Sequence, residues 1–107
     1  GMEPYHLPFD AHDIKAWPNP YFAINPEETA AYDHQIHFIN LPDEATIKIY
    51  SLAGQLVKLI NHVGGQNAIW DVRNFESERV ASGVYIAVVS THAGDKILKL
   101  AIVMRRG

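Results

Sequence analysis

The chain has 107 residues, a formal net charge of −3 at neutral pH and no cysteine. This length suits one domain that buries about two-thirds of the surface of its unfolded chain. The lack of cysteine excludes disulfides, thiolate metal sites and cysteine nucleophiles. Because acidic and basic residues are interspersed, no basic stripe is available to neutralise a run of phosphates, and nucleic acid is not an expected partner. No apolar run is long enough to cross a bilayer, so we expect no membrane insertion.

The first part of the chain carries few structural signals. Residues 1–13 are predicted to be a leader or linker, in which Gly1 before Met2 resembles the scar of a removed expression tag, unless Met2 is the natural start. This segment lacks the basic start and apolar centre of a signal peptide, so an export signal would lie upstream in a longer chain. The stretch IKAWPNPY predicts a short edge strand that its two prolines end. The sequence therefore predicts one domain over residues 14–107.

From residue 34 onward, short apolar segments alternate with turn residues. QIHFINLP and ATIKIYS place every second residue on an apolar face, which is typical of half-buried strands. Gly54 lies between YSL and QLVKLI, where a hairpin needs a residue that tolerates positive φ, and Gly64-Gly65 marks the turn before NAIWDV. GVYIAVVS and KILKLAIVM form a closing hairpin around THAGD. With IKAW, about seven strands are predicted without a helix, which indicates an all-β fold, an immunoglobulin-like antiparallel β-sandwich.

The six histidines raise the question of a metal site. His34 and His37 lie three residues apart, and in a strand such positions point to opposite faces, so the pair is not expected to share an ion. His62 and His92 lie in or beside predicted turns, where an exposed imidazole is the ordinary outcome. The other two lie in the leader. We therefore predict no metal site and no cofactor.

The segment WDVRNFESERVASG carries the acidic residues that come nearest to a catalytic cluster. Asp71, Glu76 and Glu78 lie in a predicted turn, which supplies no cleft for the carboxylate pair of a glycoside hydrolase. The spacing of Asp71, Asn74 and Glu76 does not match a calcium-binding loop. The favoured interpretation is that Asp71 caps the turn through its own backbone and that the glutamates are solvated. Since Ser82 lacks the glycine two residues before it that a nucleophile elbow needs, no catalytic residue is predicted.

Three aromatic residues, Trp17, Trp70 and Tyr85, would form a carbohydrate-binding platform if they were exposed. Trp70 shares strand parity with Ala68, so we expect it in the core or at the edge of the core. The position of Trp17 is open to either interpretation.

Several motifs in a fixed order carry a resemblance to a known family. They are WPNPY with Pro18, Asn19 and Pro20, then IHFINLP, then IKIYSLAG with Gly54, then Trp70-Asp71, then VASGVY, and the lysine-bearing last strand DKILKLAIVMR. From about residue 14 to the end, the chain resembles the C-terminal sorting domain of proteins exported by the type IX secretion system of Bacteroidetes. It is also similar to the immunoglobulin-like domain of flagellar hook-capping proteins.

The resemblance implies a non-catalytic address that directs an exported protein, by way of the periplasm, to the outer membrane surface or the extracellular space. The implied partners are proteins of the secretion machinery and an upstream domain of the same chain. An exposed edge at the terminal hairpin would allow strand addition by a partner. The alternative is a passive immunoglobulin-like spacer or assembly module packed against an upstream domain. The resemblance implies that the secretion machinery recognises the following residues: Gly83, Val84, Tyr85, Lys96, Lys99, Arg105 and Arg106.

Two positions depart from the family pattern. Many relatives have glycine after the Trp-Asp pair and before the ERVASG section, where this chain has Val72 and Ser77. We expect the change at Val72 to be mild if the site is extended, and the change at Ser77 to give a differently shaped turn.

Overall fold

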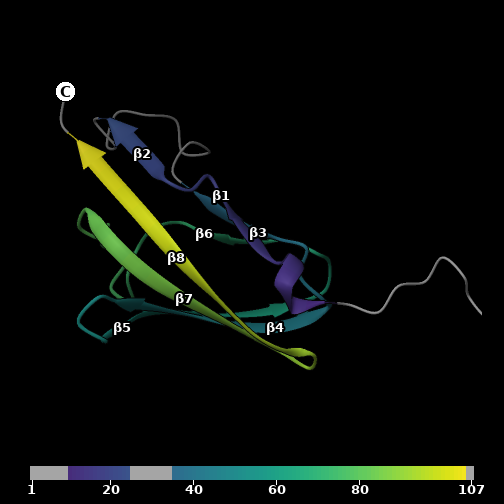
Figure 1. Ribbon diagram of the computed structural model, residues 1–107. Coiled ribbons are helices and arrows are strands. Elements are labelled where there is room, and N and C mark those ends of the chain that lie inside the picture. Colours follow the sequence, from purple (N-terminus) through teal and green to yellow (C-terminus); the bar gives the residue numbers. More distant parts are fainter. Residues whose placement is uncertain (1–9, 25–34, 106–107) are drawn as a thin grey trace, which may run out of the picture.

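The computed structural model describes residues 10–24 and 35–105, which contain eight strands and one 3₁₀ turn (Figure 1). In chain order the elements are η1 (Ala11–Asp13), β1 (Lys15–Trp17), β2 (Tyr21–Ile24), β3 (Ile36–Ile39), β4 (Glu44–Ser51), β5 (Leu56–Val63), β6 (Ala68–Trp70), β7 (Gly83–Thr91) and β8 (Gly94–Arg105). No helix in this part of the chain is long and apolar enough to span a membrane.

The strands form two sheets that pack face to face. One sheet has three strands in the order β1-β3-β6, and the other has five in the order β2-β8-β7-β4-β5 (Figure 1). All neighbours are antiparallel except β2 and β8, which run parallel. This arrangement confirms the predicted all-β, immunoglobulin-like sandwich.

The additional strand is β2, which the sequence pattern did not indicate. Its four residues follow two prolines and show too short an alternation to signal a strand. It forms because Tyr21 pairs with Ile102, at the far end of the chain, and continues along β8 as far as Arg105. Its side-chain parity is clear in the structure, where Tyr21 is fully enclosed and Phe22 is 61% exposed.

Alternate residues of the strands build the core, as the sequence pattern predicts. Along β4, burial alternates and Ile47 and Ile49 are fully enclosed. The three-stranded sheet contributes Phe38 and Trp70, so the expectation that Trp70 is a core residue is confirmed. Each enclosed side chain of this kind stabilises the fold by about 1.5–3 kcal/mol.

The β4–β5 connection is the predicted hairpin turn. Gly54 has a φ of 92°, and its amide donates to the carbonyl of Ser51. Ser51 in turn donates its amide to the carbonyl of Gln55 at 2.8 Å, which closes the hairpin. A side chain at Gly54 would be strained by this left-handed backbone, so the glycine is required by conformation.

The structure corrects one expectation about the histidines. His62 is buried, because β5 extends to Val63 and places His62 opposite the inward-facing Ala45. Its Nε2 lies 2.8 Å from the carbonyl oxygen of Gly65, so the ring ties the strand to the following turn. His12 and His92 are exposed, whereas His37 is half-buried in β3. The remaining two, His6 and His34, lie outside the described residues.

Residues 10–13, which the sequence assigns to a leader, pack on the sandwich. Ala11 belongs to the core, and Lys96 donates through Nζ to the carbonyl oxygen of His12 at 3.3 Å. Asp10 caps η1, and the backbone N–H and ring of His12 hold the pKa of its carboxyl below the usual value. The domain limit at residue 14 remains a prediction, and these contacts are the reason to retain residues 10–13 in tests of the domain.

The two departures from the family pattern both have left-handed backbone. Val72 has a φ of 62° and Ser77 a φ of 63°, so an extended backbone, the condition under which the change at Val72 would be mild, is not met. This conformation costs a residue with a Cβ about 1–2 kcal/mol. Val72 is fully buried, and burial of its side chain, worth about 1.5–3 kcal/mol, offsets that cost. Ser77 adopts a conformation that glycine also favours, and the expectation of a differently shaped turn stays a prediction.

Replacing Ser77 with glycine is expected to raise the free energy of unfolding by about 0.5 kcal/mol, because relief of the left-handed strain exceeds the extra entropy of the unfolded chain. Ser77 is exposed, so no buried contact is lost. Thermal unfolding followed by circular dichroism would measure the change. Ser77→Ala keeps the strain and serves as the control; a gain in stability for alanine equal to that for glycine would contradict the explanation.

Candidate recognition surface

The acidic segment after β6 is a turn held by its own backbone. Asp71 accepts the amide of Arg73 through Oδ1 at 3.1 Å, which confirms its predicted capping role. Asn74 Oδ1 accepts two further amides, from Glu76 at 2.9 Å and Glu78 at 3.0 Å. Both glutamate side chains are exposed. In the described parts of the chain, no three histidine or carboxylate side chains gather in a way that would hold a metal ion.

The three aromatic residues considered for a carbohydrate platform do not form one. Trp70 and Tyr85 are 1% and 8% exposed, and their rings meet edge to face inside the sandwich with centroids 6.2 Å apart. Trp17 is 62% exposed and lies on the opposite, three-stranded sheet, where its ring is 5.5 Å from that of His37. A shared stacking surface is therefore excluded by the placement of these side chains.

The Pro-Asn-Pro motif attaches the start of the domain to the last strand. Asn19, between Pro18 and Pro20, donates through Nδ2 to the carbonyl of Lys99 at 2.8 Å and accepts the amide of Ala101 through Oδ1 at 3.1 Å. The side-chain amide thereby makes the two hydrogen bonds that a neighbouring strand would make. Immediately afterwards β2 takes over the pairing with β8 at Ile102.

The C-terminal end of β8 is held on both edges. On the β7 side, the hydroxyl of Ser82 donates to the carbonyl of Met104 at 3.1 Å and accepts the Met104 amide at 2.7 Å. On the other side lie the Asn19 amide and β2. The expectation of a free edge at the terminal hairpin is therefore wrong from Lys99 onward, because these contacts already use the backbone groups that strand addition needs.

The residues that the secretion machinery is expected to recognise lie in different environments. Gly83 and Lys99 are exposed and Val84 is half-buried. Tyr85 is in the core, its hydroxyl donates to the carbonyl of Ala81 at 2.6 Å, and burial raises its pKa above the ordinary value. Lys96 is half-buried and contacts η1 through its Nζ.

The structure describes the two arginines of this set only in part. Arg105 is the last residue of β8, and Arg106 lies outside the described residues. Within the full set, Val84 of β7 and Lys99 of β8 lie on the same face of these adjacent strands. Tyr85 points to the opposite face, into the core.

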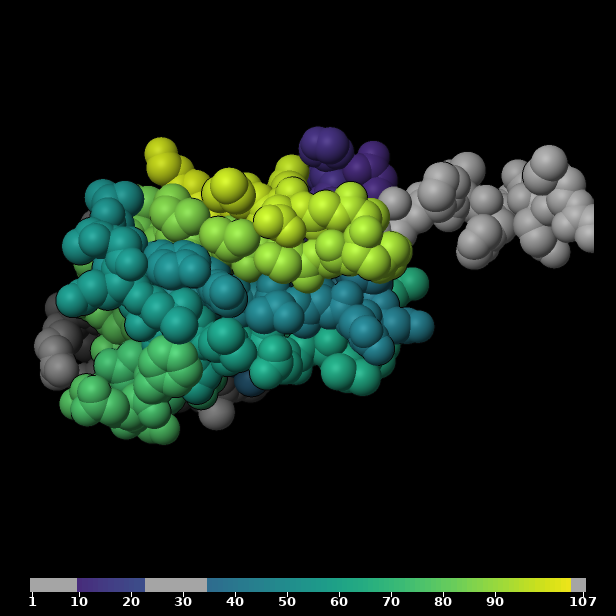
Figure 2. Space-filling view, turned by 90° about the horizontal axis from the view of Figure 1, so that it is seen from below, coloured from purple at the N-terminus to yellow at the C-terminus, as the bar shows by residue number. Residues whose placement is uncertain are grey.

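Val84 and Lys99 belong to the outer face of the five-stranded sheet. Figure 2 shows this face, where β8 and β7, in yellow and lime, lie beside β4 and β5, in blue and teal. Its β7 and β8 positions, called here the β7–β8 face, are Val84, Ile86, Val88, Ile97, Lys99, Ala101 and Val103. Sequence reasoning did not identify this surface. The available signal was GVYIAVV, which is apolar at consecutive positions and thus on both sides of the strand.

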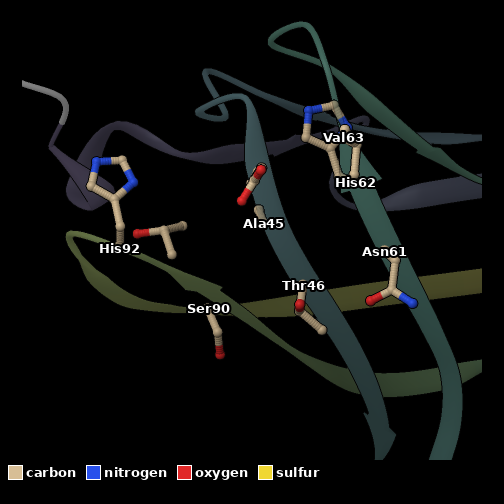
Figure 3. A pocket seen from close by; sticks show the side chains of 9 residues that line it. Ala45, Thr46, Asn61, His62, Val63, Ser90 and His92 are labelled. Atoms are coloured by element: carbon tan, nitrogen blue, oxygen red, sulfur yellow. The ribbon is translucent and has the colours of Figure 1, made fainter.

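A shallow hollow of about 490 Å³ lies at one end of the same sheet, between β4, β5 and β7 (Figure 3). Thr46 lies opposite both Asn61 and Ser90, and the three form a polar row across the strands. Figure 3 shows His62 and His92 on opposite sides of the hollow, and His62 is already engaged with Gly65. The hollow is open to solvent, and none of the described residues in the implied recognition set lines it.

Comparison with known proteins shows a matching family, and the similar solved structures include PorZ, PorU and FlgD. The sequence matches the family described as a secretion system C-terminal sorting domain over residues 15–103. PorZ, an essential bacterial surface component of the type-IX secretion system of Porphyromonas gingivalis, is 26% identical with a TM-score of 0.67, over 85% of this chain and 11% of that chain. Dimeric latent PorU from P. gingivalis is 19% identical with a TM-score of 0.56, over 86% of this chain and 9% of that chain.

FlgD from P. aeruginosa is 20% identical with a TM-score of 0.43, over 66% of this chain and 61% of that chain. The chain thus spans about a tenth of the length of the PorZ and PorU chains. No curated protein sequence matches it significantly.

Proposed function

The chain belongs to the family of secretion system C-terminal sorting domains, and on this premise we propose how it acts as an address. Its role is sorting in type IX secretion, and such a tail marks proteins for the cell surface or the extracellular space. The family is in general non-catalytic. The observation that carries the assignment is the family match over residues 15–103, which includes both sheets of the sandwich.

We propose further that this domain has no catalytic activity of its own. Asp71, the leading catalytic candidate, is engaged in capping its turn, and the nearby glutamates point into solvent. The partners would be proteins of the secretion machinery, and the protein carried would be an upstream domain of the same chain. The role as a passive spacer is not favoured, because the family match is to a sorting domain.

The residues read by the machinery are proposed to be those that the fold presents on its surface. Gly83, Val84 and Lys99 are available for contact, and Lys96, Arg105 and Arg106 complete the implied set. Tyr85 would act indirectly, because its buried ring and its bond to Ala81 position the start of β7. The folded sandwich, rather than a linear peptide, would therefore be the signal.

Export of a reporter tests this function. Residues 1–107 would be fused behind a signal peptide and a fluorescent protein in a bacterium with type IX secretion. We expect the reporter at the cell surface or in the medium, and we expect this export to be lost when the secretion system is deleted. Mass spectrometry of the exported reporter would also show whether the domain is removed. Retention in the periplasm with the domain intact would contradict the sorting role.

A further inference from the structure

The outer face of β7 is apolar where an exposed strand is usually polar. Tyr85, Ala87 and Val89 point into the core, as the burial pattern of the strand shows. The intervening residues point outward, and they are Val84, Ile86 and Val88. An antiparallel sheet with one solvated face normally alternates apolar and polar residues, whereas a strand covered on both sides is apolar throughout. The run of apolar residues in β7 is thus typical of a strand that is covered on both faces of its sheet.

The apolar surface continues across the neighbouring strands. Val88 lies opposite Ile97, which is 66% exposed, and Val84 lies opposite Ala101. Next to them, Val103 is opposite Phe22 of β2, which is 61% exposed. No described element crosses the β7–β8 face in Figure 2. A continuous apolar area of this kind marks an interaction site.

The charged side chains on the centre of the β7–β8 face and on the adjoining part of β4 are positive. Lys48 of β4 lies opposite Val88, and Lys99 lies opposite Ile86. The carboxylates of the outer face, Glu44 and Asp95, lie at the end of the strands near the β7–β8 turn. A complementary surface would therefore be apolar and would carry carboxylates at the positions of the two lysines.

We propose that the β7–β8 face is the surface by which this domain docks on a protein of the secretion machinery. The partner presents an apolar patch with carboxylates that face Lys48 and Lys99. This proposal rests on the sorting role and specifies how that role is carried out: the machinery reads one face of the folded sheet, because the edge of β8 from Lys99 onward is already occupied by Asn19 and β2.

Two other occupants fit the charges less well. A second copy of the chain, packed face to face, would bring the lysines of both copies together without carboxylates at the centre. An anionic lipid surface is attracted by clusters of four to eight basic residues, whereas the described side chains here include two lysines, Lys99 on the face and Lys48 beside it. The whole chain has a net charge of −3. A protein partner with acidic groups satisfies both the apolar and the charged parts of the surface.

Four variants of the reporter fusion test the proposal. Val88→Thr with Ile97→Thr makes the face polar while keeping β-branched side chains, and Lys48→Glu with Lys99→Glu reverses its charge. The matched controls are Ile69→Thr and Lys15→Glu, both at exposed positions on the three-stranded sheet. We expect both face variants to lower the export rate at least about fivefold, and both controls to change it less than about twofold. Thermal unfolding of each purified domain would verify that the variants fold.

A photo-crosslinking residue at position 97 gives a second readout, with position 69 as its control. We expect an adduct with a secretion-machinery protein from position 97 only, and less of it after charge reversal at Lys48 and Lys99. Normal export of folded face variants would overturn the docking proposal and leave the sorting role intact. Loss of export from the Ile69 variant alone, an adduct with a second copy only, or flotation of the domain with phosphatidylglycerol vesicles would also overturn it. Retention of the unsubstituted fusion would overturn the sorting role itself.

Discussion

Replacing Trp70 with alanine is expected to lower the free energy of unfolding by about 3–5 kcal/mol, which is a large part of the stability of a domain of this size. Trp70 is 1% exposed and its ring meets Tyr85 edge to face. Its Nε1 donates to the carbonyl of Arg73 at 2.9 Å, so the same side chain fixes the start of the left-handed turn. The truncation therefore creates a cavity and leaves that carbonyl without its donor.

Chemical denaturation followed by circular dichroism would measure the loss for Trp70→Ala. The control is Trp17→Ala, since Trp17 is the other tryptophan and is 62% exposed. We expect this control to cost less than about 1 kcal/mol. Equal losses at the two positions would show that Trp70 is not a central residue of the core.

Replacing Asn19 with aspartate is expected to cost about 1–2 kcal/mol, although the two side chains have nearly the same shape. Asn19 accepts from the Ala101 amide and donates to the Lys99 carbonyl. A carboxylate keeps the acceptor but cannot donate, and it places a negative oxygen against the carbonyl oxygen. The Pro-Asn-Pro motif should therefore be sensitive to the loss of a single donor.

Hydrogen exchange gives this prediction a local readout. The Ala101 amide should lose protection in Asn19→Ala, because its acceptor is gone, and keep more of it in Asn19→Asp. Asn67→Asp is the control, since Asn67 is exposed and changes charge in the same way. If Asn67→Asp lowers the stability as much as Asn19→Asp does, the charge and not the lost hydrogen bond is responsible.

The clamp by Asn19 and the apolar face together change the mode of recognition implied by the sequence. The terminal hairpin suggested an edge open to strand addition, but Asn19, β2 and Ser82 occupy the backbone groups of β8 from Lys99 to Arg105. What the domain still presents there is a face of side chains. Recognition by such a face requires the folded sheet, because its apolar residues share one surface only when β7, β8 and β2 are paired.

The sequence by itself determined the fold class, the turns and the family. Alternation in ATIKIYS placed Ile47 and Ile49 in the core, Gly54 marked a hairpin that needs positive φ, and Trp70-Asp71 was correctly interpreted as a core residue followed by a turn cap. These features depend on local conformation and on the two-residue period of a strand, so they can be deduced from neighbouring residues.

Only the tertiary structure decided the features that depend on distant partners. β2 exists because of β8, and Asn19 has its role because Lys99 and Ala101 lie beside it. His62 is buried by the register of β5 against β4, and Val72 adopts a left-handed backbone because the core encloses its side chain. In each case the deciding energy comes from packing or pairing in the folded sandwich, which the pattern of neighbouring residues does not encode.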